Sequence, residues 1–296
     1  MKSQEWFKGA VKALRNAGIS SPEKEAQEML SALGINPVEL FKRNPVLNQD
    51  ELKKLTEYLE RRKKREPLQY ILGYTYFLDL KIKTERGVLI PRPETELLVL
   101  EVIREISSFP SGTRPDLILD LCTGTGAIAL SIGSFLKDSL VYGVDISEKA
   151  ISIAKGNAEL NGIKNVIFLQ GDLFEPFKGK DMQFDIITAN PPYIKTDDIN
   201  DLEPEVRDWE PLEALNGGKD GLKFYRRIIT DAPKFLKNGG LLFLELGAGL
   251  YKEVISLAKL NRFTEISIVK DLNGIERILK GKFRGVEDEG SYPYRK

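Results

Sequence analysis

Apolar residues from about position 95 onward follow two alternating patterns. Short, continuous apolar runs predict buried strands, and longer stretches with apolar residues three or four positions apart predict helices. Because strands that are apolar throughout must be covered on both faces, the alternation predicts an α/β fold with a doubly wound, mostly parallel sheet. The expected strands are residues 116–121, 140–144, 166–170, 184–189 and 241–246, and the expected helices begin near Thr95 and cover 127–135, 148–160 and 222–235.

The last two apolar segments depart from this alternation. Residues 264–269 and 277–280 flank the short turn Asp271–Gly274. Two strands joined so closely must run antiparallel to each other. The sequence therefore predicts a seven-stranded sheet that is parallel except for a final hairpin, an arrangement characteristic of one large class of methyltransferases. We expect this domain to span residues 95–282, followed by a loose polar tail at 283–296.

The first 72 residues have a purely helical pattern. We expect three helices, of which the second begins after the Ser-Pro pair at 21–22 and the third runs from about residue 49 into the basic run Arg61–Arg65. The basic run could contact RNA or an acidic partner, but we favour a solvated helix end that complements the helix dipole. Residues 1–72 thus predict a small all-α domain, and the change of period at 73–94 predicts a β-hairpin linker.

The amino-acid composition excludes several kinds of catalytic and metal-binding chemistry. The 296 residues include no histidine and a single cysteine, Cys122. Without imidazole, the usual general base and the commonest metal ligand are missing, and one cysteine forms no internal disulfide. We therefore expect no metal site. Transfer of a group that is already activated fits these limits.

Charge and hydropathy favour neither a nucleic-acid partner nor a membrane. The first 72 residues carry a net charge of +4 (14 basic against 10 acidic), and the remainder carries −4 (30 against 34). Apolar runs stay well short of the roughly 18 residues needed to cross a bilayer, and the first residues lack a signal-peptide pattern. We expect a cytoplasmic protein that binds no nucleic acid stably.

A turn that contains two glycines follows the first predicted strand of the sheet. Residues Asp120–Gly126 lead directly into a helix, whose first N–H groups are free to bind a negative group. Asp145 ends the second strand, where it can accept hydrogen bonds from ribose hydroxyls. Because dinucleotide-binding loops share this spacing, the turn leaves open S-adenosylmethionine, a nicotinamide or flavin cofactor, and a tight turn without ligand.

Two further positions favour S-adenosylmethionine. Asp120 lies one turn before the glycines, where it could pair with the ammonium group of the cofactor's amino acid. The segment Asp172–Phe174 follows the third strand, where an adenine ring would lie, although Asp172 could equally cap the loop.

The segment Asn190-Pro191-Pro192-Tyr193 follows the strand at 184–189, next to the expected switch point of the sheet, where ligands bind in such folds. The prolines fix the backbone and push Asn190 to an extended conformation. The side-chain carbonyl of Asn190 and the backbone carbonyl of Pro191 can then each accept one hydrogen of an –NH2 group. Tyr193 can pack on the flat group that carries this nitrogen.

Such a segment suits methyl transfer to an amide or base nitrogen. The lone pair of this nitrogen is delocalised, which makes it a poor nucleophile. Two acceptors would direct the lone pair toward the methyl carbon and stabilise the positive charge that grows on the nitrogen. Orientation of this kind can supply on the order of 7–11 kcal/mol of the barrier. The alternative interpretation is a proline turn that merely ends a strand.

The sequence resembles, to about residue 280, the bacterial N5-glutamine methyltransferases of class-1 peptide-chain release factors. The motif at 190–193 alone is shared with nucleic-acid amino methyltransferases, but the segment Ile90–Glu96 and the helical front narrow the match to the glutamine group. The other matching segments are Pro67–Gly73, Leu119-Asp120 with Thr123–Ile128, Glu210-Pro211, Asp220–Leu222 and Asp271–Arg277.

This resemblance implies a class I S-adenosylmethionine-dependent methyltransferase whose acceptor is the glutamine of a Gly-Gly-Gln loop. It implies that Asn190, Pro191, Pro192 and Tyr193 hold the glutamine. It also implies that S-adenosyl-L-methionine is lined by Cys122, Thr123, Gly124, Thr125, Gly126, Asp145, Leu173 and Asn190. Cys122 stands where the family often has glycine, so its side chain must point away from the cofactor. Arg92 and Glu94 either shape the glutamine entrance or pair with each other.

Two other functions remain open at this point. An N-methyltransferase acting on DNA adenine or rRNA guanine would need a basic groove or a base-flipping pocket, which the acidic remainder of the chain does not favour. A nucleotide-binding partner protein without catalysis is disfavoured by Asp145 together with Asn190–Tyr193. We predict a monomeric enzyme whose protein substrate, a release factor, docks on the helical front.

Overall fold

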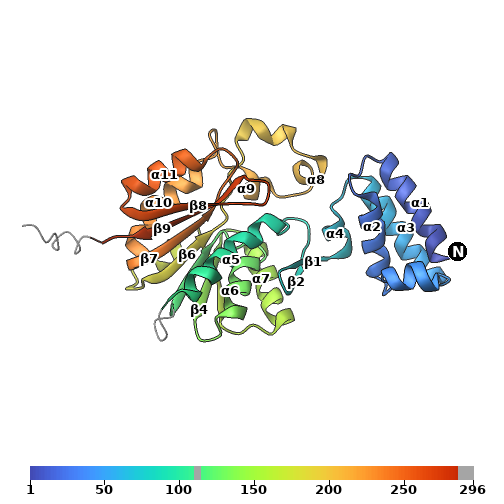
Figure 1. Ribbon diagram of the computed structural model, residues 1–296, viewed down its shortest axis with the longest axis horizontal. Helices are drawn as coiled ribbons and strands as arrows, with labels where there is room; N and C mark the ends of the chain where they lie inside the picture. Colours follow the sequence, from blue (N-terminus) through green and yellow to red (C-terminus); the bar gives the residue numbers. More distant parts are fainter. Residues whose placement is uncertain (110–114, 286–296) are drawn as a thin grey trace, which may run out of the picture. The chain divides into compact units, whose positions relative to one another are not determined.

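The computed structural model describes residues 1–109 and 115–285, which form two compact units (Figure 1). The helical unit comprises residues 1–75, 84–86 and 202–209. The sheet unit comprises residues 76–83, 87–201 and the chain from 210 onward. Each unit has its own apolar core. None of the helices in the described ranges is long and apolar enough to span a membrane.

The helical unit is built on the amphipathic helices that the sequence predicts. Trp6 and Leu14 of the first helix are buried, as the pattern requires, and Asn48 and Glu51 form a reciprocal capping box at the start of the third. Its elements are α1 Ser3–Asn16, α2 Pro22–Ser31, the π-helix η1 Glu39–Arg43, α3 Gln49–Lys63, α4 Leu68–Leu72 and, far along the chain, α8 Pro204–Arg207.

The basic run at 61–65 ends α3 as predicted, and Lys63 and Lys64 are exposed, but Arg62 is buried, which corrects the prediction for that residue. Arg62 is only 5% exposed and lies 2.5 Å from a Glu25 carboxylate oxygen and 2.9 Å from a Glu205 oxygen. Arg65 donates to both Glu205 and Glu203. These carboxylates lie in the segment 202–209, which is remote in sequence but packs within the helical unit. A local pattern could not reveal that the basic run has buried partners.

The sheet unit contains one seven-stranded sheet in the order β5-β4-β3-β6-β7-β9-β8. Within this sheet β3 to β7 run parallel, and β9 runs antiparallel between β7 and β8. The predicted α/β class with an antiparallel final hairpin is confirmed. The strands are β3 Leu117–Leu121, β4 Leu140–Asp145, β5 Val166–Gln170, β6 Phe184–Ala189, β7 Leu236–Glu245, β8 Phe263–Lys270 and β9 Glu276–Phe283.

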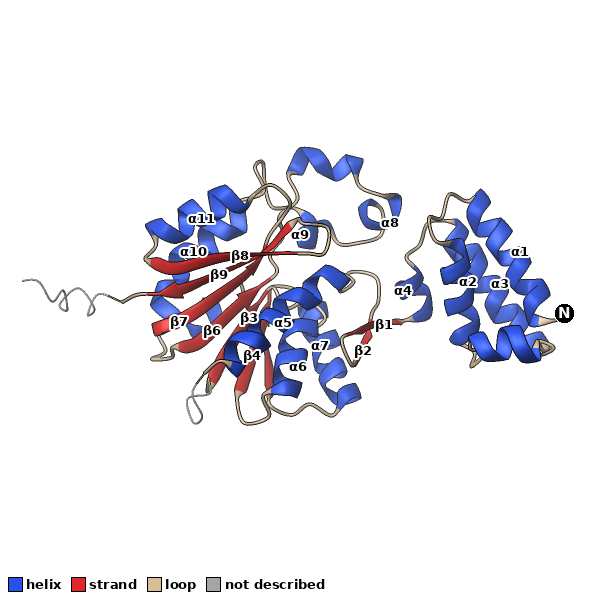
Figure 2. Cartoon of the chain, viewed as in Figure 1, coloured by secondary structure: helices blue, strands red, loops and turns tan. Residues whose placement is uncertain are grey.

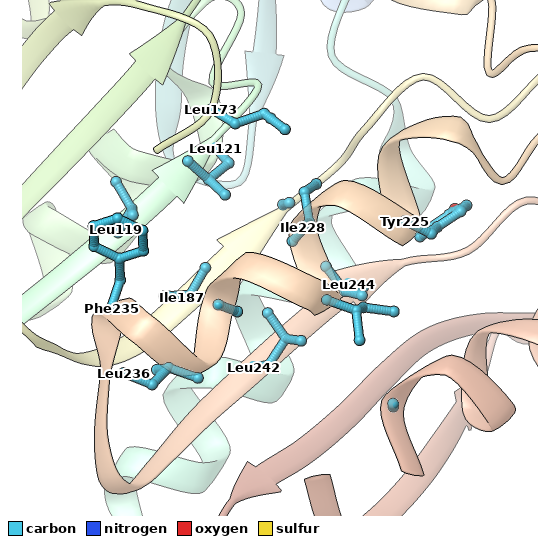
Figure 3. Packing of buried hydrophobic residues seen from close by; sticks show 14 of the residues in the cluster. Leu119, Leu121, Leu173, Ile187, Tyr225, Ile228, Phe235, Leu236, Leu242 and Leu244 are labelled. Atoms are coloured by element: carbon cyan, nitrogen blue, oxygen red, sulfur yellow. The ribbon is translucent and has the colours of Figure 1, made fainter. Parts of the chain in front are cut away.

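Helices cover both faces of this sheet (Figure 2). One face packs against α5 Pro93–Ser107, α6 Ala127–Phe135 and α7 Glu148–Asn161, and the other against α10 Lys223–Phe235 and α11 Tyr251–Leu260. Figure 3 shows the second layer, where Leu119, Ile187 and Leu242 meet Ile228 and Phe235 of α10. The sequence did not predict α11. Short segments complete the unit: η2 Glu175–Phe177, η3 Thr196–Asp201 and α9 Leu212–Leu215.

The chain segments that flank the sheet follow the prediction in part. Strands β1 Tyr74–Phe77 and β2 Leu80–Lys83 form the expected two-stranded hairpin. The expected loose tail at 283–296 begins too early, because Phe283 belongs to β9 and the next two residues donate backbone hydrogen bonds to Arg262 and Asn238. The rest of that tail, residues 286–296, lies outside the described residues.

The buried charges of the helical unit predict a large effect for one arginine. Arg62→Ala leaves the Glu25 and Glu205 carboxylates without their shared cation, so the free energy of unfolding should fall by about 3–5 kcal/mol. Urea unfolding followed by tryptophan fluorescence measures this directly, because Trp6 and Trp209, the two tryptophans of the chain, both belong to the helical unit.

The matched control is Arg43→Ala, which removes an exposed i,i+4 pair with Glu39 and should cost about 0.3–0.5 kcal/mol. Equal losses for the two variants would show that the Arg62 network contributes no more than a surface pair.

Candidate active site

The carboxyl ends of three neighbouring strands open into one cavity of about 760 Å³ within the sheet unit. Strand order reverses between β3 and β6, which makes this edge the topological switch point of the sheet, the usual ligand site in such folds. The turn after β3, the end of β4 and the segment after β6 all contribute to its wall. The cavity therefore brings the two predicted sites together, the glycine turn and the Asn-Pro-Pro-Tyr segment.

The predicted site residues divide between the cavity wall and its support. Gly126, Pro191 and Tyr193 are not among the residues that line the wall. The wall includes the other predicted residues, which are Cys122, Thr123, Gly124, Thr125, Asp145, Leu173, Asn190 and Pro192.

The turn between β3 and α6 has two glycines with different tasks. Gly124 adopts a φ of +55°, and a Cβ built on it would meet nothing within 4 Å, so its surface is open to a ligand. Gly126 adopts a φ of +81°, and a Cβ there would lie 2.8 Å from the Phe168 ring and 3.0 Å from Ala154. The first glycine therefore exposes backbone, and the second lets the turn pack tightly against β5 and α7.

Asp145 braces this turn from the end of β4. Its Oδ2 accepts from the Gly124 backbone N–H at 2.9 Å, and its Oδ1 accepts from the Ser147 N–H at 2.9 Å. Burial raises the pKa of this carboxyl, against the opposing effect of the backbone donors. Each carboxylate oxygen can accept more than one hydrogen bond, so Asp145 can still receive hydroxyl groups of a ligand.

Asp120 is not placed to meet an ammonium group, which corrects the prediction made for it. The side chain is fully buried, and its two oxygens accept from the hydroxyls of Thr123 at 2.6 Å and Thr188 at 2.8 Å. Burial raises the pKa of Asp120 to about 7, although both threonine hydroxyls oppose this. The carboxyl thus ties the turn to β6 from beneath the cavity.

Two wall residues adopt left-handed backbone conformations without being glycine. Cys122 has a φ of 56° and Leu173 a φ of 55°. The Cys122 side chain packs against the apolar cluster under the turn, and burial raises the pKa of its thiol. Asp172 contributes to the wall and pairs with Arg227 at 2.7 Å. Strained conformations of this kind persist where surrounding contacts hold them, and they gather at ligand sites.

Glycines of other loops press against the segment Asn190–Tyr193. A Cβ on Gly217 would lie 2.6 Å from the Tyr193 Cα, and one on Gly221 would lie 2.6 Å from the Tyr193 carbonyl oxygen. A Cβ on Gly247 would lie 2.9 Å from the Tyr193 ring. The loop at 215–218 also exchanges backbone hydrogen bonds with Ile194. Side chains at these three glycines would displace the segment, so its backbone is held from several sides.

Hydrogen bonds fix the side chains of the same segment. The Asn190 Nδ2 donates to the Thr95 hydroxyl at 3.2 Å, and the Tyr193 hydroxyl donates to the Glu245 Oε1 at 3.3 Å. Tyr225 supports this arrangement from α10, because its hydroxyl donates to the Glu245 carbonyl and accepts from the Gly247 N–H. An asparagine whose amide nitrogen is bound in this way has its carbonyl oxygen available on the other side.

Arg92 takes a different partner from the one considered in the sequence. Its guanidinium donates to both carboxylate oxygens of Glu210, at 2.7 and 2.6 Å. Arg92 also lines the cavity. Burial raises the pKa of Glu210, and the Arg92 charge opposes this. The pair joins the start of α5 to the segment before α9 at the cavity mouth.

Sequence reasoning missed the supporting residues Thr95, Tyr225 and Glu245. Thr95 lies inside the segment Ile90–Glu96 that carried the resemblance, so the segment was identified, but the contact of Thr95 with Asn190 was not predicted. Tyr225 is one of many buried positions on α10, and the helical pattern does not indicate that its hydroxyl binds the backbone of Glu245 and Gly247.

Comparison with known proteins places this geometry in a family. A model described as a methyltransferase domain matches residues 115–279, and one described as the PrmC N-terminal domain matches residues 5–73. The release factor glutamine methyltransferase of Thermodesulfovibrio yellowstonii is 52% identical over 258 residues, which cover 86% of this chain and 91% of that protein. The chain belongs to the release factor glutamine methyltransferase family.

A second relative agrees with this assignment, and a solved structure shares the fold. The release factor glutamine methyltransferase of Geobacter sulfurreducens is 40% identical over 283 residues, which cover 95% of each chain. The T. thermophilus 16S rRNA N2 G1207 methyltransferase, solved with AdoMet and guanosine, shares the fold with a TM-score of 0.52 and 21% identity. That match covers 71% of this chain and 50% of that one. The fold is therefore that of class I methyltransferases.

The solved rRNA methyltransferase holds AdoMet, S-adenosylmethionine. The cavity fits it on three observations. The open face of Gly124 admits a ligand against the backbone, the Asp145 carboxylate keeps accepting capacity for hydroxyl groups, and Leu173 supplies an apolar wall. The volume of about 760 Å³ lies within the range of small-molecule sites, roughly 300–1,000 Å³.

The raised pKa of Asp120 predicts how stability depends on pH. A carboxyl whose folded-state pKa rises from 3.8 to about 7 contributes stability that is present below pH 3.8 and lost as the pH rises through 7. Asp120→Asn removes this loss. The free energy of unfolding of the ligand-free variant should therefore gain on that of the natural protein by roughly 2 kcal/mol between pH 5.5 and 7, and by little more up to pH 8.5. Its melting temperature should rise accordingly relative to that of the natural protein.

Differential scanning calorimetry across this pH range is the measurement, with Asp197→Asn on the exposed η3 as the control. A gap between Asp120→Asn and the natural protein that stays constant from pH 5.5 to 8.5 would contradict the burial of an ionised Asp120.

Proposed function

We propose that the protein transfers a methyl group from S-adenosylmethionine to the side-chain amide nitrogen of the glutamine in a Gly-Gly-Gln loop of class-1 release factors. The observation that carries this proposal is the Asn190 amide. Its nitrogen is bound to Thr95 inside the same cavity that holds the cofactor turn, which leaves its carbonyl oxygen for an –NH2 group. The names of the relatives specify a release factor glutamine as the acceptor.

The two ends of the cavity have separate tasks. S-adenosylmethionine supplies a methyl group already activated by a positive sulfonium. Cys122–Gly126, Asp145 and Leu173 hold it through the open turn and the carboxylate at the end of β4. Asn190, Pro191, Pro192 and Tyr193 hold the glutamine, with the Asn190 and Pro191 carbonyls as the two acceptors and the Tyr193 ring beside the flat amide. The separation lets each ligand be positioned by a different strand end.

Orientation, rather than removal of a proton, is what the chain supplies to the nitrogen. An amide nitrogen must lose conjugation before it can attack, and two carbonyl acceptors stabilise the positive charge that develops on it. The methylated amide cation is a strong acid, so its proton passes to water without a basic side chain. A chain with no histidine can therefore carry out this reaction.

Asn190→Ala tests the proposed acceptor site. It should lower kcat for a Gly-Gly-Gln peptide by about 100-fold or more, because a transition-state acceptor is lost, while the Kd for S-adenosylmethionine changes by only a few fold. Mass spectrometry of the product gives the rate and the modified atom, and calorimetry gives the Kd.

Asn161→Ala is the control for this experiment, since the Asn161 amide bonds to Lys81 and to its own helix rather than to a ligand site. Parallel reactions contain DNA or rRNA in place of the peptide. Normal peptide methylation by Asn190→Ala, or methylation of nucleic acid alone by the natural protein, would overturn the assignment of the acceptor.

The helical unit is the part that docks the release factor in this proposal. A cavity for a single side chain offers too little area to bind a folded protein, so a further surface is needed. The helical unit presents exposed apolar side chains at Val38, Phe41 and Val46. In this proposal these side chains form part of the docking surface. In this proposal the enzyme is a monomer. It acts in the cytoplasm, where its release-factor substrate is found.

Charged substitutions on this surface test docking. The double change Phe41→Asp with Val46→Asp, at side chains 57% and 70% exposed, should raise KM for intact release factor about tenfold and leave KM for a Gly-Gly-Gln peptide unchanged. The matched control is Leu260→Asp, at an 82% exposed leucine of the sheet unit. If both substrates respond equally, or the control matches the double variant, the helical unit does not dock the factor.

A further inference from the structure

An asparagine side chain can face a ligand in two ways that differ little in shape. Rotation of its amide by 180° exchanges a carbonyl oxygen, which accepts, for an –NH2 group, which donates. Only the first orientation suits the proposed acceptor, because a glutamine –NH2 that meets a second –NH2 forms no hydrogen bond. The active site therefore needs a neighbouring group that fixes the orientation of the Asn190 amide.

We propose that Thr95, backed by the Glu245 carboxylate, is a positioning residue that turns the Asn190 carbonyl oxygen toward the acceptor. This inference rests on the proposed function for the identity of the acceptor. Thr95 lies in the first turn of α5, is buried, and forms part of the cavity wall. Its hydroxyl oxygen receives the Asn190 Nδ2 at 3.2 Å. The amide nitrogen is therefore occupied on the side away from the acceptor.

Glu245 decides which way the Thr95 hydroxyl points. A hydroxyl can donate its hydrogen to Asn190 or accept from it, so Thr95 alone would permit either orientation of the amide. An ionised carboxylate only accepts hydrogen bonds. Next to such a group, the Thr95 hydrogen is directed to the carboxylate, and the Thr95 oxygen is left to accept from Asn190.

The surroundings of Glu245 leave room for this donor. The residue ends β7 and is buried, and its Oε1 accepts from Tyr193 at 3.3 Å. Its Oε2 is buried and has no hydrogen-bond partner. Burial raises the pKa of Glu245 to about 6, and the hydroxyls of Thr95 and Tyr193 oppose the rise. At pH 8 the carboxyl is ionised, with one oxygen toward Tyr193 and the other available to Thr95.

The arrangement forms a chain with a fixed direction. Glu245 accepts from Tyr193 through Oε1, and in this proposal its free Oε2 receives the Thr95 hydrogen. Thr95 accepts from Asn190, which then offers only its carbonyl oxygen to the cavity. One carboxylate thereby orients both side chains of the segment Asn190–Tyr193 that carry polar groups. Reversal of the amide would require the Thr95 hydrogen to leave the carboxylate, which would remove a donor from a buried charge.

Two substitutions at Thr95 separate orientation from packing. Thr95→Val keeps the shape and removes the hydroxyl, whereas Thr95→Ser keeps the hydroxyl. At pH 8, Thr95→Val should lower kcat for a Gly-Gly-Gln peptide about tenfold, the scale of one lost hydrogen bond, with the Kd for S-adenosylmethionine within twofold of the natural value. Thr95→Ser should recover kcat to within about threefold.

A Gly-Gly-Glu peptide reports the orientation itself. A reversed Asn190 presents its –NH2 group, which donates hydrogen bonds to a carboxylate, whereas a carbonyl oxygen repels one. Inhibition by this peptide should therefore strengthen several-fold in Thr95→Val and stay near the natural value in Thr95→Ser, a pattern that a packing defect would not produce. Glu245→Gln, which removes the charge but keeps the shape, should give the same stronger inhibition. It provides the test if Thr95→Val does not fold.

Side-chain amide NMR of Asn190 provides a readout that needs no acceptor. Its –NH2 protons should exchange slowly with water in the natural protein and at least tenfold faster in Thr95→Val. Failure of the natural protein to methylate the Gly-Gly-Gln peptide would refute the proposed function, and the exchange rates would still decide the orientation. Equal exchange rates in the two proteins, or equal inhibition by Gly-Gly-Glu across the variants, would overturn the role of Thr95.

Discussion

The backbone of Asn190–Tyr193 has almost no freedom, and the rest of the active site depends on this constraint. Two prolines restrict it from within, and the close approach of Gly217, Gly221 and Gly247 restricts it from outside. A carbonyl oxygen that moved by an ångström could no longer meet both a fixed nitrogen and a fixed methyl group. The glycines are therefore as necessary to the site as the residues that touch the ligands.

Buried carboxyls in this protein orient other groups instead of moving protons. Asp120 ties the cofactor turn to β6 through two threonines, Glu245 receives Tyr193, and Glu210 holds Arg92 at the cavity mouth. Burial raises the pKa of all three. Holding these groups in place reduces the stability of the folded chain at neutral pH, a common expense of a preorganised site. In return, the nitrogen acceptor meets carbonyl groups that need no rearrangement during the reaction.

Much of the fold could be predicted because it follows from local pattern. The apolar runs that became β5 and β6 are properties of adjacent residues, and both strands are confirmed. The cavity could be located because parallel strands bring Asp145 and Asn190 to one edge. The ligand roles of the predicted site residues stay predictions, since their positions alone do not establish what they bind.

What the sequence could not reveal depends on contacts between distant residues. Arg62 meets Glu205 only because residues 202–209 pack within the helical unit, and Thr95 meets Asn190 from 95 positions away. Asp120 was expected to face an ammonium group, but the hydroxyls of Thr123 and Thr188 occupy its oxygens. Hydrophobic periodicity reports which side chains are buried and not which polar groups they meet once buried.

The most direct measurement is a crystal structure of the enzyme with S-adenosylhomocysteine and a Gly-Gly-Gln peptide. The account predicts that the glutamine amide nitrogen lies within about 3.2 Å of both the Asn190 Oδ1 and the Pro191 carbonyl oxygen, the reach of an ordinary hydrogen bond. A glutamine bound through its carbonyl oxygen to the Asn190 Nδ2, or an Asn190 side chain turned out of the cavity, would contradict it.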